Sequence, residues 1–193
     1  DGIPQKVDTF QEAVAPVSIV LALDSSGSMV RATDAVKTAA TSFVEALRPE
    51  DSLSVLPFSD TSVFAHDLTT KRQQSIGAID AYVASGGTAL YDGLTDALMR
   101  LKRTEGRKVV VLLSDGRDEN NPGTGPGSAR SQNDVFAALE DTDAVIYPIG
   151  LGPRVDRALL QQLAERSGGL AYFPEDVSSL RNDYARVIES LRR

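Results

Sequence analysis

Runs of apolar residues alternate with amphipathic stretches along this chain. Two runs, at residues 17–23 and 108–113, are rich in branched apolar side chains, which is typical of strands buried on both faces of a parallel sheet. Shorter runs predict four further strands, at residues 52–58, 62–68, 144–149 and 170–173. Apolar residues recur with helical spacing over residues 31–47, 71–83, 90–101, 133–141, 156–167 and 177–191.

The order of these segments predicts an α/β fold. Strands that alternate with helices imply right-handed crossovers, a mostly parallel sheet and helices on both faces. The turn at residues 59–61 is too short for a crossover, so residues 62–68 are expected to form one antiparallel edge strand. We therefore expect a doubly wound, Rossmann-like, six-stranded domain over residues 17–193. Residues 1–16, which include Pro4 and Pro16, are interpreted as a lead-in at the tail of a preceding domain.

Composition and charge exclude several classes of function. The 27 acidic and 20 basic side chains give a net charge of −7, which argues against binding to nucleic acid or to an anionic membrane surface. The chain has no cysteine, and this excludes disulfides, thiol chemistry and Cys-ligated zinc. The single histidine, His66, is expected to be structural or solvent-facing. No apolar run approaches the roughly eighteen residues of a membrane span, so this fragment is not expected to insert into a membrane.

Hard oxygen donors follow both long apolar runs. Asp24, Ser26 and Ser28 come after the first run, Asp115 after the second, and Thr88 follows a glycine pair. Because ligands bind beyond the carboxyl ends of strands in open α/β sheets, these side chains are expected to share one crevice. Donor sets made only of oxygen suit Mg²⁺, Mn²⁺ or Ca²⁺ rather than Zn²⁺. The alternative is that the sequence DSSGS is only a polar turn that caps the following helix.

Three short motifs together resemble the von Willebrand factor type A domain. The sequence DSSGS, followed by Met29, resembles its D-x-S-x-S signature, and GGT at residues 86–88 and SDG at residues 114–116 resemble its second and third metal-site motifs. The resemblance implies a metal-ion-dependent adhesion site in which Ser26, Ser28 and Thr88 ligate the cation directly. Asp24 and Asp115 would act largely through bound water or as carboxylates that lie just behind the direct ligands.

That resemblance also implies a function. The expected cation is Mg²⁺ or Mn²⁺, with Ca²⁺ less favoured, and its open position would accept an Asp or Glu carboxylate from a partner protein. The chain is therefore expected to be a non-enzymatic adhesion module. The family resemblance suggests an extracytoplasmic location, secreted or periplasmic. A narrower likeness of the first residues to bacterial proteins with this domain implies that residues 1–13 are the tail of a missing N-terminal module. The sequence indicates neither the partner nor the oligomeric state.

Two other functions stay open. In a metal-dependent hydrolase or phosphotransferase, Asp24 would be the nucleophile, although such enzymes usually carry a second acid where this chain has Ser26, and no Walker A motif is present. Alternatively, the site serves only the stability of an assembly domain.

The irregular segment 117–131 is either a partner-contact loop or passively disordered. Within it, Asp118 and Glu119 either form a neighbouring cation site or are solvated. Arg117 either faces a partner's carboxylate or is an ordinary surface arginine.

Overall fold

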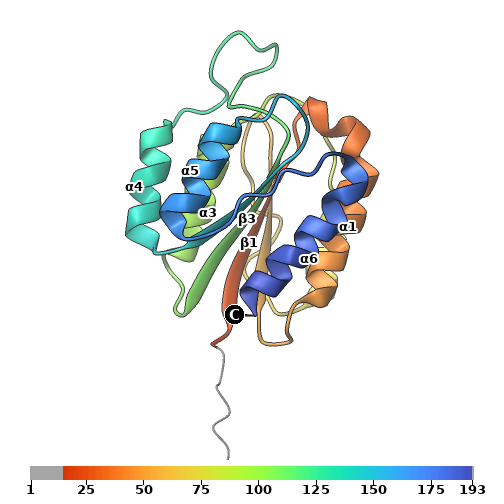
Figure 1. The fold of residues 1–193 in the computed structure, drawn as a ribbon, viewed down its shortest axis with the longest axis vertical. Helices are drawn as coiled ribbons and strands as arrows, with labels where there is room; N and C mark the ends of the chain where they lie inside the picture. Colours follow the sequence, from red (N-terminus) through yellow and green to blue (C-terminus); the bar gives the residue numbers. More distant parts are fainter. Residues whose placement is uncertain (1–14, 193) are drawn as a thin grey trace, which may run out of the picture.

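A four-stranded parallel sheet lies between two layers of helices in the computed structural model, which describes residues 15–192 (Figure 1). The predicted lead-in at residues 1–16 therefore lies almost wholly outside the described residues. The strands are β1 (Val17–Asp24), β2 (Ser52–Phe58), β3 (Arg107–Ser114) and β4 (Val145–Gly150). The α-helices are α1 (Thr33–Ala46), α2 (Arg72–Asp80), α3 (Leu90–Leu101), α4 (Gln132–Thr142), α5 (Arg157–Ser167) and α6 (Leu180–Leu191).

Two 3₁₀ turns precede helices. The turn η1 (Gly27–Ala32) leads into α1, and η2 (Val177–Ser179) leads into α6. The helix predicted from residue 31 therefore begins in a tighter turn, and its regular α-helical part starts at Thr33.

The strand order is β2-β1-β3-β4, and every pair of neighbours is parallel. In register, Val20 of β1 lies between Ser54 of β2 and Val110 of β3. The chain moves from β1 to β2 on one side and then crosses to β3 on the other, so its winding reverses between β1 and β3. The carboxyl ends of these two strands form the crevice where such folds bind ligands.

Side-chain alternation along the strands creates a core on each face of the sheet. In β1, Ile19, Leu21 and Leu23 pack into the core beneath α1, α2 and α6, whereas Val20 and Ala22 pack into the core beneath α3, α4 and α5 (Figure 1). All five side chains are fully buried. Each large aliphatic side chain buried in this way stabilises the fold by about 1.5–3 kcal/mol, which explains the nearly continuous apolar sequence of β1.

The prediction of six strands is wrong, because two of the predicted strands make only isolated bridges. Residues 62–68 follow the outer edge of β2 with antiparallel bridges at Ser62 and Thr69, and they form no regular strand. Pro57 of β2 has no N–H to donate to this segment, which interrupts the ladder. Residues 170–173 pair with β4 through a single parallel bridge at Tyr172. Within residues 15–192, the sheet therefore has neither the predicted antiparallel edge strand nor a sixth strand.

Candidate metal centre

Asp24, the last residue of β1, carries a fully buried carboxylate. Its Oδ1 accepts a hydrogen bond from the backbone N–H of Ser26 at 2.9 Å, and its Oδ2 accepts one from the Ser114 hydroxyl at 2.6 Å. These bonds fold residues 24–26 into a tight turn and tie the end of β1 to the end of β3. Each carboxylate oxygen keeps a further lone pair for water or a cation.

Hydroxyl groups continue from this turn toward the surface. Ser26 Oγ and Ser28 Oγ lie 3.0 Å apart, and Ser28 Oγ donates to Asp115 Oδ1 at 2.7 Å. The Thr88 hydroxyl lies beside the residue after Asp115, because a Cβ added at Gly116 would be 3.6 Å from Thr88 Oγ1. Four of the five predicted site residues are thus connected by direct hydrogen bonds, and Thr88 lies next to that network.

A cavity of about 340 Å³ opens at this network. Ser28 and Thr88 line it together with Gly116 and Glu119, and two guanidinium groups, from Arg117 and Arg154, complete the wall. Ser26 is buried and Ser28 is exposed, so the hydroxyl pair reaches from the interior to the cavity. A group bound to these hydroxyls would therefore be accessible to a ligand from solvent.

Burial perturbs both carboxylic acids of the site. Desolvation raises the pKa of Asp24 from 3.8 to about 6, although its hydrogen bonds to Ser114 and Ser26 oppose the shift. Desolvation likewise raises the pKa of Asp115, against the opposing effects of the Ser28 hydrogen bond and the positive charge of Arg154. Among residues 15–192, neither carboxylate forms an ion pair. The two carboxylic acids therefore lie close together without a direct ion-pair partner among these residues.

The donor set fits a small divalent cation. Neighbouring ligands of an octahedral Mg²⁺, at 2.0–2.1 Å from the metal, are about 2.9 Å apart, whereas the longer bonds of Ca²⁺ require a wider spacing. The two serine hydroxyls are hydrogen-bonded to each other at 3.0 Å, a separation that two ligands of one cation can share. Within the described part of the chain, no three His, Cys, Asp or Glu side chains gather into a metal-binding group, so a cation at this site would have to rely on hydroxyls.

Backbone hydrogen bonds fix the turn after β1 against its neighbours. Ser25 donates both its N–H and its hydroxyl to the carbonyl of Phe58 at the end of β2, at 2.7 and 2.9 Å. Gly27 N–H donates to the carbonyl of Gly86 at 3.0 Å, and Tyr82 donates its hydroxyl to the Asp24 carbonyl at 2.6 Å. These contacts explain how residues 60 positions apart in sequence come to share one site.

The glycine pair before Thr88 is required by its surroundings. Gly86 has φ +82°, a conformation that glycine adopts without strain. Gly87 donates its N–H to Asp60 Oδ1 at 2.8 Å and leaves no room for a Cβ between Asp60 and the backbone of residues 119–121. This turn presents Thr88, which is only 4% exposed, to the cavity.

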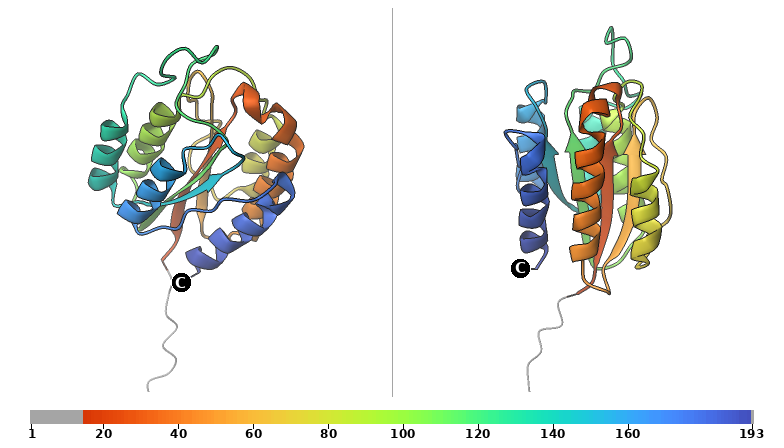
Figure 2. Two further views of the ribbon diagram at one scale, coloured as in Figure 1. Left: turned by 45° about the horizontal axis from the view of Figure 1, so that its top comes forward. Right: turned by 90° about the vertical axis from the view of Figure 1, so that its right-hand side faces the viewer.

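The long loop after β3 is anchored rather than disordered. Thr88 exchanges two backbone hydrogen bonds with Glu119, at 2.8 and 3.2 Å. The carboxylate of Asp118 accepts from the N–H groups of Tyr91, Gly127 and Ser128 at 3.1–3.3 Å and from the Ser128 hydroxyl. Both alternatives for Asp118, a cation site or a solvated side chain, are therefore wrong, because its oxygens hold the loop. The loop projects beyond the carboxyl ends of the strands (Figure 2).

Several functional residues escaped the sequence reasoning. Ser114 was noted only as part of a motif, yet its hydroxyl contacts the Asp24 carboxylate. Arg154 was not considered, although it follows β4, whose carboxyl end lies at the same edge as those of β1 and β3. The carboxyl ends of β1, β3 and β4 share one edge of the sheet, and this relation could have identified Arg154 from the predicted topology. Asp60 and Tyr82, which hold the supporting turns, carried no signal.

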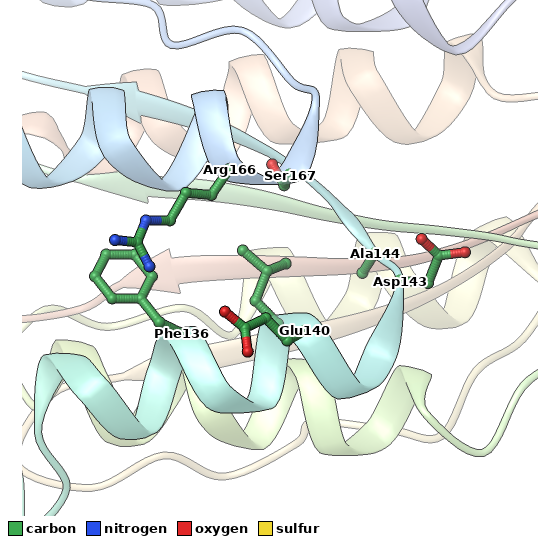
Figure 3. Close-up of a pocket in the computed structure, with 7 residues that line it drawn as sticks. Phe136, Glu140, Asp143, Ala144, Arg166 and Ser167 are labelled. Carbon is green, nitrogen blue, oxygen red and sulfur yellow. The ribbon is translucent and has the colours of Figure 1, made fainter.

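Two other features lie away from this centre. A hollow of about 390 Å³ lies between α4 and α5, where the Arg166 guanidinium covers the Phe136 ring at 4.0 Å from its centroid (Figure 3). Ser167, at its edge, accepts the Ile146 N–H at 2.9 Å, a structural role. The His66 ring is mostly buried and contacts the Asp67 carbonyl through Nδ1 at 2.7 Å.

The burial of Asp24 also bears on the hydrolase alternative. A carboxylate nucleophile must reach its substrate, but Asp24 has no exposed surface, and both of its oxygens accept hydrogen bonds. In this conformation the Asp24 carboxylate lies on the buried side of the serine hydroxyls. It could contact a bound cation only from that side.

Comparisons with known proteins agree with this architecture. The von Willebrand factor type A domain model matches residues 18–186. The mouse calcium-activated chloride channel regulator 3A-1 is 28% identical over 183 residues, which cover 88% of this chain and 19% of that protein. The chain spans 18 to 60% of the length of the curated relatives that it matches.

Two solved structures show the same fold. A von Willebrand factor type A protein from Catenulispora acidiphila has a TM-score of 0.78 and 21% identity, covering 92% of this chain and 43% of that one. Proximal thread matrix protein 1 from the mussel byssus, with a zinc-occupied MIDAS motif, has a TM-score of 0.74 and 23% identity, covering 92% and 46%.

Domains of this family generally mediate metal-dependent protein–protein interactions and are typically not enzymes. Among the described residues, no helix combines the length and apolar character needed to cross a membrane. The match over most of the sequence, together with the doubly wound fold, shows that the chain belongs to the von Willebrand factor type A domain family.

Proposed function

We propose that this chain is a divalent-cation-dependent protein-binding module. Ser26, Ser28 and Thr88 would hold Mg²⁺ or Mn²⁺ through their hydroxyls, and Asp24 and Asp115 would act through bound water or from just behind. The observation that carries this proposal is the pair of carboxylic acids, one fully buried and both with raised pKa values, which have no ion-pair partner among the described residues and lie beside hydroxyls that lead to the exposed Ser28. A cation relieves this excess of negative charge.

The partner would supply a carboxylate, from Asp or Glu, to the open coordination position. Neutral hydroxyl ligands leave more positive charge on the cation than carboxylate ligands would, so the bound metal attracts an anionic oxygen. The cavity at Ser28 and Thr88 gives such a group a route to the site. An extracytoplasmic location is part of the proposal, supported by a similar protein from the byssus thread of a mussel.

The first experiment measures thermal unfolding in chelator and then with Mg²⁺, Mn²⁺ or Ca²⁺. A cation that binds only the folded state at 100 times its dissociation constant adds about 2.7 kcal/mol of stability. We expect a dose-dependent rise with Mg²⁺ and Mn²⁺, and a weaker one with Ca²⁺. The Ser26→Ala variant should lose the rise, whereas the matched Ser42→Ala variant, altered in α1 away from the site, should keep it. The absence of a shift in the wild type would contradict the proposal.

A second measurement tests whether the site binds a partner's carboxylate or only stabilises the fold. The Mn²⁺-loaded protein is titrated with short peptides that contain one Asp, and the water-proton relaxation of the bound Mn²⁺ is followed. If the carboxylate enters the coordination sphere, it displaces water and the relaxation enhancement falls. If Mn²⁺ binds but no carboxylate displaces its water, the site serves stability alone and the proposed binding function is wrong.

A further inference from the structure

The wall of the metal-site cavity carries two arginines that the cation itself does not need. Arg117 and Arg154 come from the loops after β3 and β4, which are neighbours in the sheet. Both side chains are exposed, and within residues 15–192 neither makes an ion pair, a hydrogen bond or a contact with an aromatic ring. Two arginines without a direct ion-pair or hydrogen-bond partner among these residues thus line the same cavity as the proposed cation.

Both arginines are carried by fixed backbone. Arg117 is followed by Asp118, whose carboxylate anchors the loop to α3. Arg154 lies between two fixed points: Leu151 donates its N–H to the Ser114 carbonyl at 2.9 Å, and Val155 is buried in the core. Asp156 then caps α5 by accepting the N–H of Leu159 at 3.0 Å. The backbone position of each arginine is therefore fixed by its loop, and only its side chain has to be ordered when a ligand binds.

The charge balance of the cavity depends on the cation. Two arginines oppose three carboxylates, Asp24, Asp115 and Glu119, which gives a net charge of −1 without metal. A bound divalent cation changes this to +1, so the occupied site attracts anions while the empty one repels them. A single carboxylate on the metal would leave the two arginines, which lie on separate loops, without a direct ion-pair partner in the described part of the chain.

On this basis we propose that the site recognises an acidic segment of a partner protein with two carboxylates, one on the cation and the second on Arg154 and Arg117. The inference rests on the proposed function. A guanidinium cannot lose its charge when a partner covers it, so an anionic group must pair with it if the interface is to be stable. The planar fork of an arginine pairs well with a carboxylate. The cavity, at about 340 Å³, lies at the lower end of the range for ligand sites and suits a short acidic segment.

The test uses the Mn²⁺-loaded protein and pentapeptides with two Asp residues that are adjacent or separated by one or two Gly residues. Each is compared with the same peptide in which the second Asp is replaced by Asn, and dissociation constants come from Mn²⁺ water-proton relaxation. We expect the best two-Asp peptide to bind about tenfold more tightly than its Asn counterpart, a ratio that corresponds to one favourable charged contact. In Arg154→Gln and in Arg117→Gln this ratio should fall toward one.

The control variant is Arg103→Gln, which removes the same charge from an exposed position just after the far end of α3. It should keep the wild-type ratio, because charges well beyond the Debye length of about 8–10 Å are screened at physiological salt. The affinity for Mn²⁺ itself should be almost unchanged in Arg117→Gln and Arg154→Gln, because these side chains are not among its proposed ligands.

Two outcomes overturn the inference but keep the proposed function. In one, wild-type protein binds one-Asp and two-Asp peptides equally. In the other, Arg154→Gln weakens both peptides by the same factor, so that the arginine acts on the metal-bound carboxylate. A third outcome, in which Mn²⁺ binds but no peptide displaces its water, overturns both proposals and is distinguished from the first two by the unchanged relaxation.

Discussion

Replacing Asp24 with Asn should stabilise the metal-free protein at neutral pH. The Asp24 carboxyl group is fully buried, and burial raises its pKa from 3.8 to about 6. Because the folded-state pKa is the higher one, the folded state binds more protons between these values. The contribution of Asp24 to stability is therefore fully present below pH 3.8 and is lost as the pH rises through 6. At 1.36 kcal/mol per pKa unit, this loss amounts to about 3 kcal/mol at pH 7.

The Asn side chain avoids this loss because it cannot ionise. Its carbonyl oxygen can accept the Ser26 N–H, and its amide can donate to the Ser114 hydroxyl, so both observed hydrogen bonds have a replacement. In chelator at pH 7 we expect Asp24→Asn to be up to about 3 kcal/mol more stable than wild type. For a domain of this size, that difference corresponds to a rise in Tm of about 6–12 °C.

The assay is urea unfolding followed by circular dichroism, since the chain has no tryptophan. Curves for wild type and variant are collected in chelator from pH 4 to pH 8, and the difference in unfolding free energy is plotted against pH. The difference should be near zero at pH 4 and reach its maximum above pH 6. The Asp80→Asn variant, altered at an exposed carboxylate, should show no such pH dependence. A difference that does not vary with pH, or a variant that is less stable at pH 7, would refute the reasoning.

Two further predictions concern packing near the site. A Cβ at Gly127 would overlap the carbonyl of Thr88, so Gly127→Ala should weaken Mg²⁺-induced stabilisation, measured by thermal titration. The control is Gly125→Ala, whose Cβ meets only a side-chain amide at 3.5 Å and which should keep this stabilisation. The buried Tyr184 hydroxyl has no partner among the described residues. Tyr184→Phe should therefore leave the unfolding free energy unchanged or raise it by about 1 kcal/mol, whereas Tyr82→Phe, which loses a 2.6 Å hydrogen bond, should lower it by about 1 kcal/mol. An equal loss of unfolding free energy in both variants would contradict the conclusion that the Tyr82 hydroxyl, and not the Tyr184 hydroxyl, forms a stabilising hydrogen bond.

The sequence predicted the centre of the sheet because local pattern and tertiary environment agree there. The apolar runs of β1 and β3 can be accommodated only between two layers of helices, and each ends where the crevice forms. The edges were predicted less well. Residues 62–68 have the alternation of a strand, but whether a bridge extends into a ladder depends on the partner, and Pro57 cannot donate to it. A single-sequence pattern does not contain that pairing information.

The site was predictable where a motif places its own residues, as in the turn from Asp24 to Ser28. The contacts of the site were not predictable where they join segments that are distant in sequence and come together only in the folded structure. Asp118 looked like a ligand or a solvated charge, because nothing local indicates that its carboxylate accepts the N–H groups of Tyr91, Gly127 and Ser128. These partners lie up to 27 positions away, and the strand order alone brings them together.

The arrangement explains why carboxylic acids are needed at a site where hydroxyls provide the proposed direct contacts. Asp24 and Asp115 raise the free energy of the metal-free state, because their charges are desolvated and have no ion-pair partner. A proton or a divalent cation can relieve the same penalty, so the two compete for the site. Under the proposed function, cation binding would gain free energy from relief of this repulsion, while hydroxyl ligands from Ser26 and Ser28 would keep the metal poor in electrons. Stability, cation affinity and attraction for an acidic partner then follow from one charge imbalance.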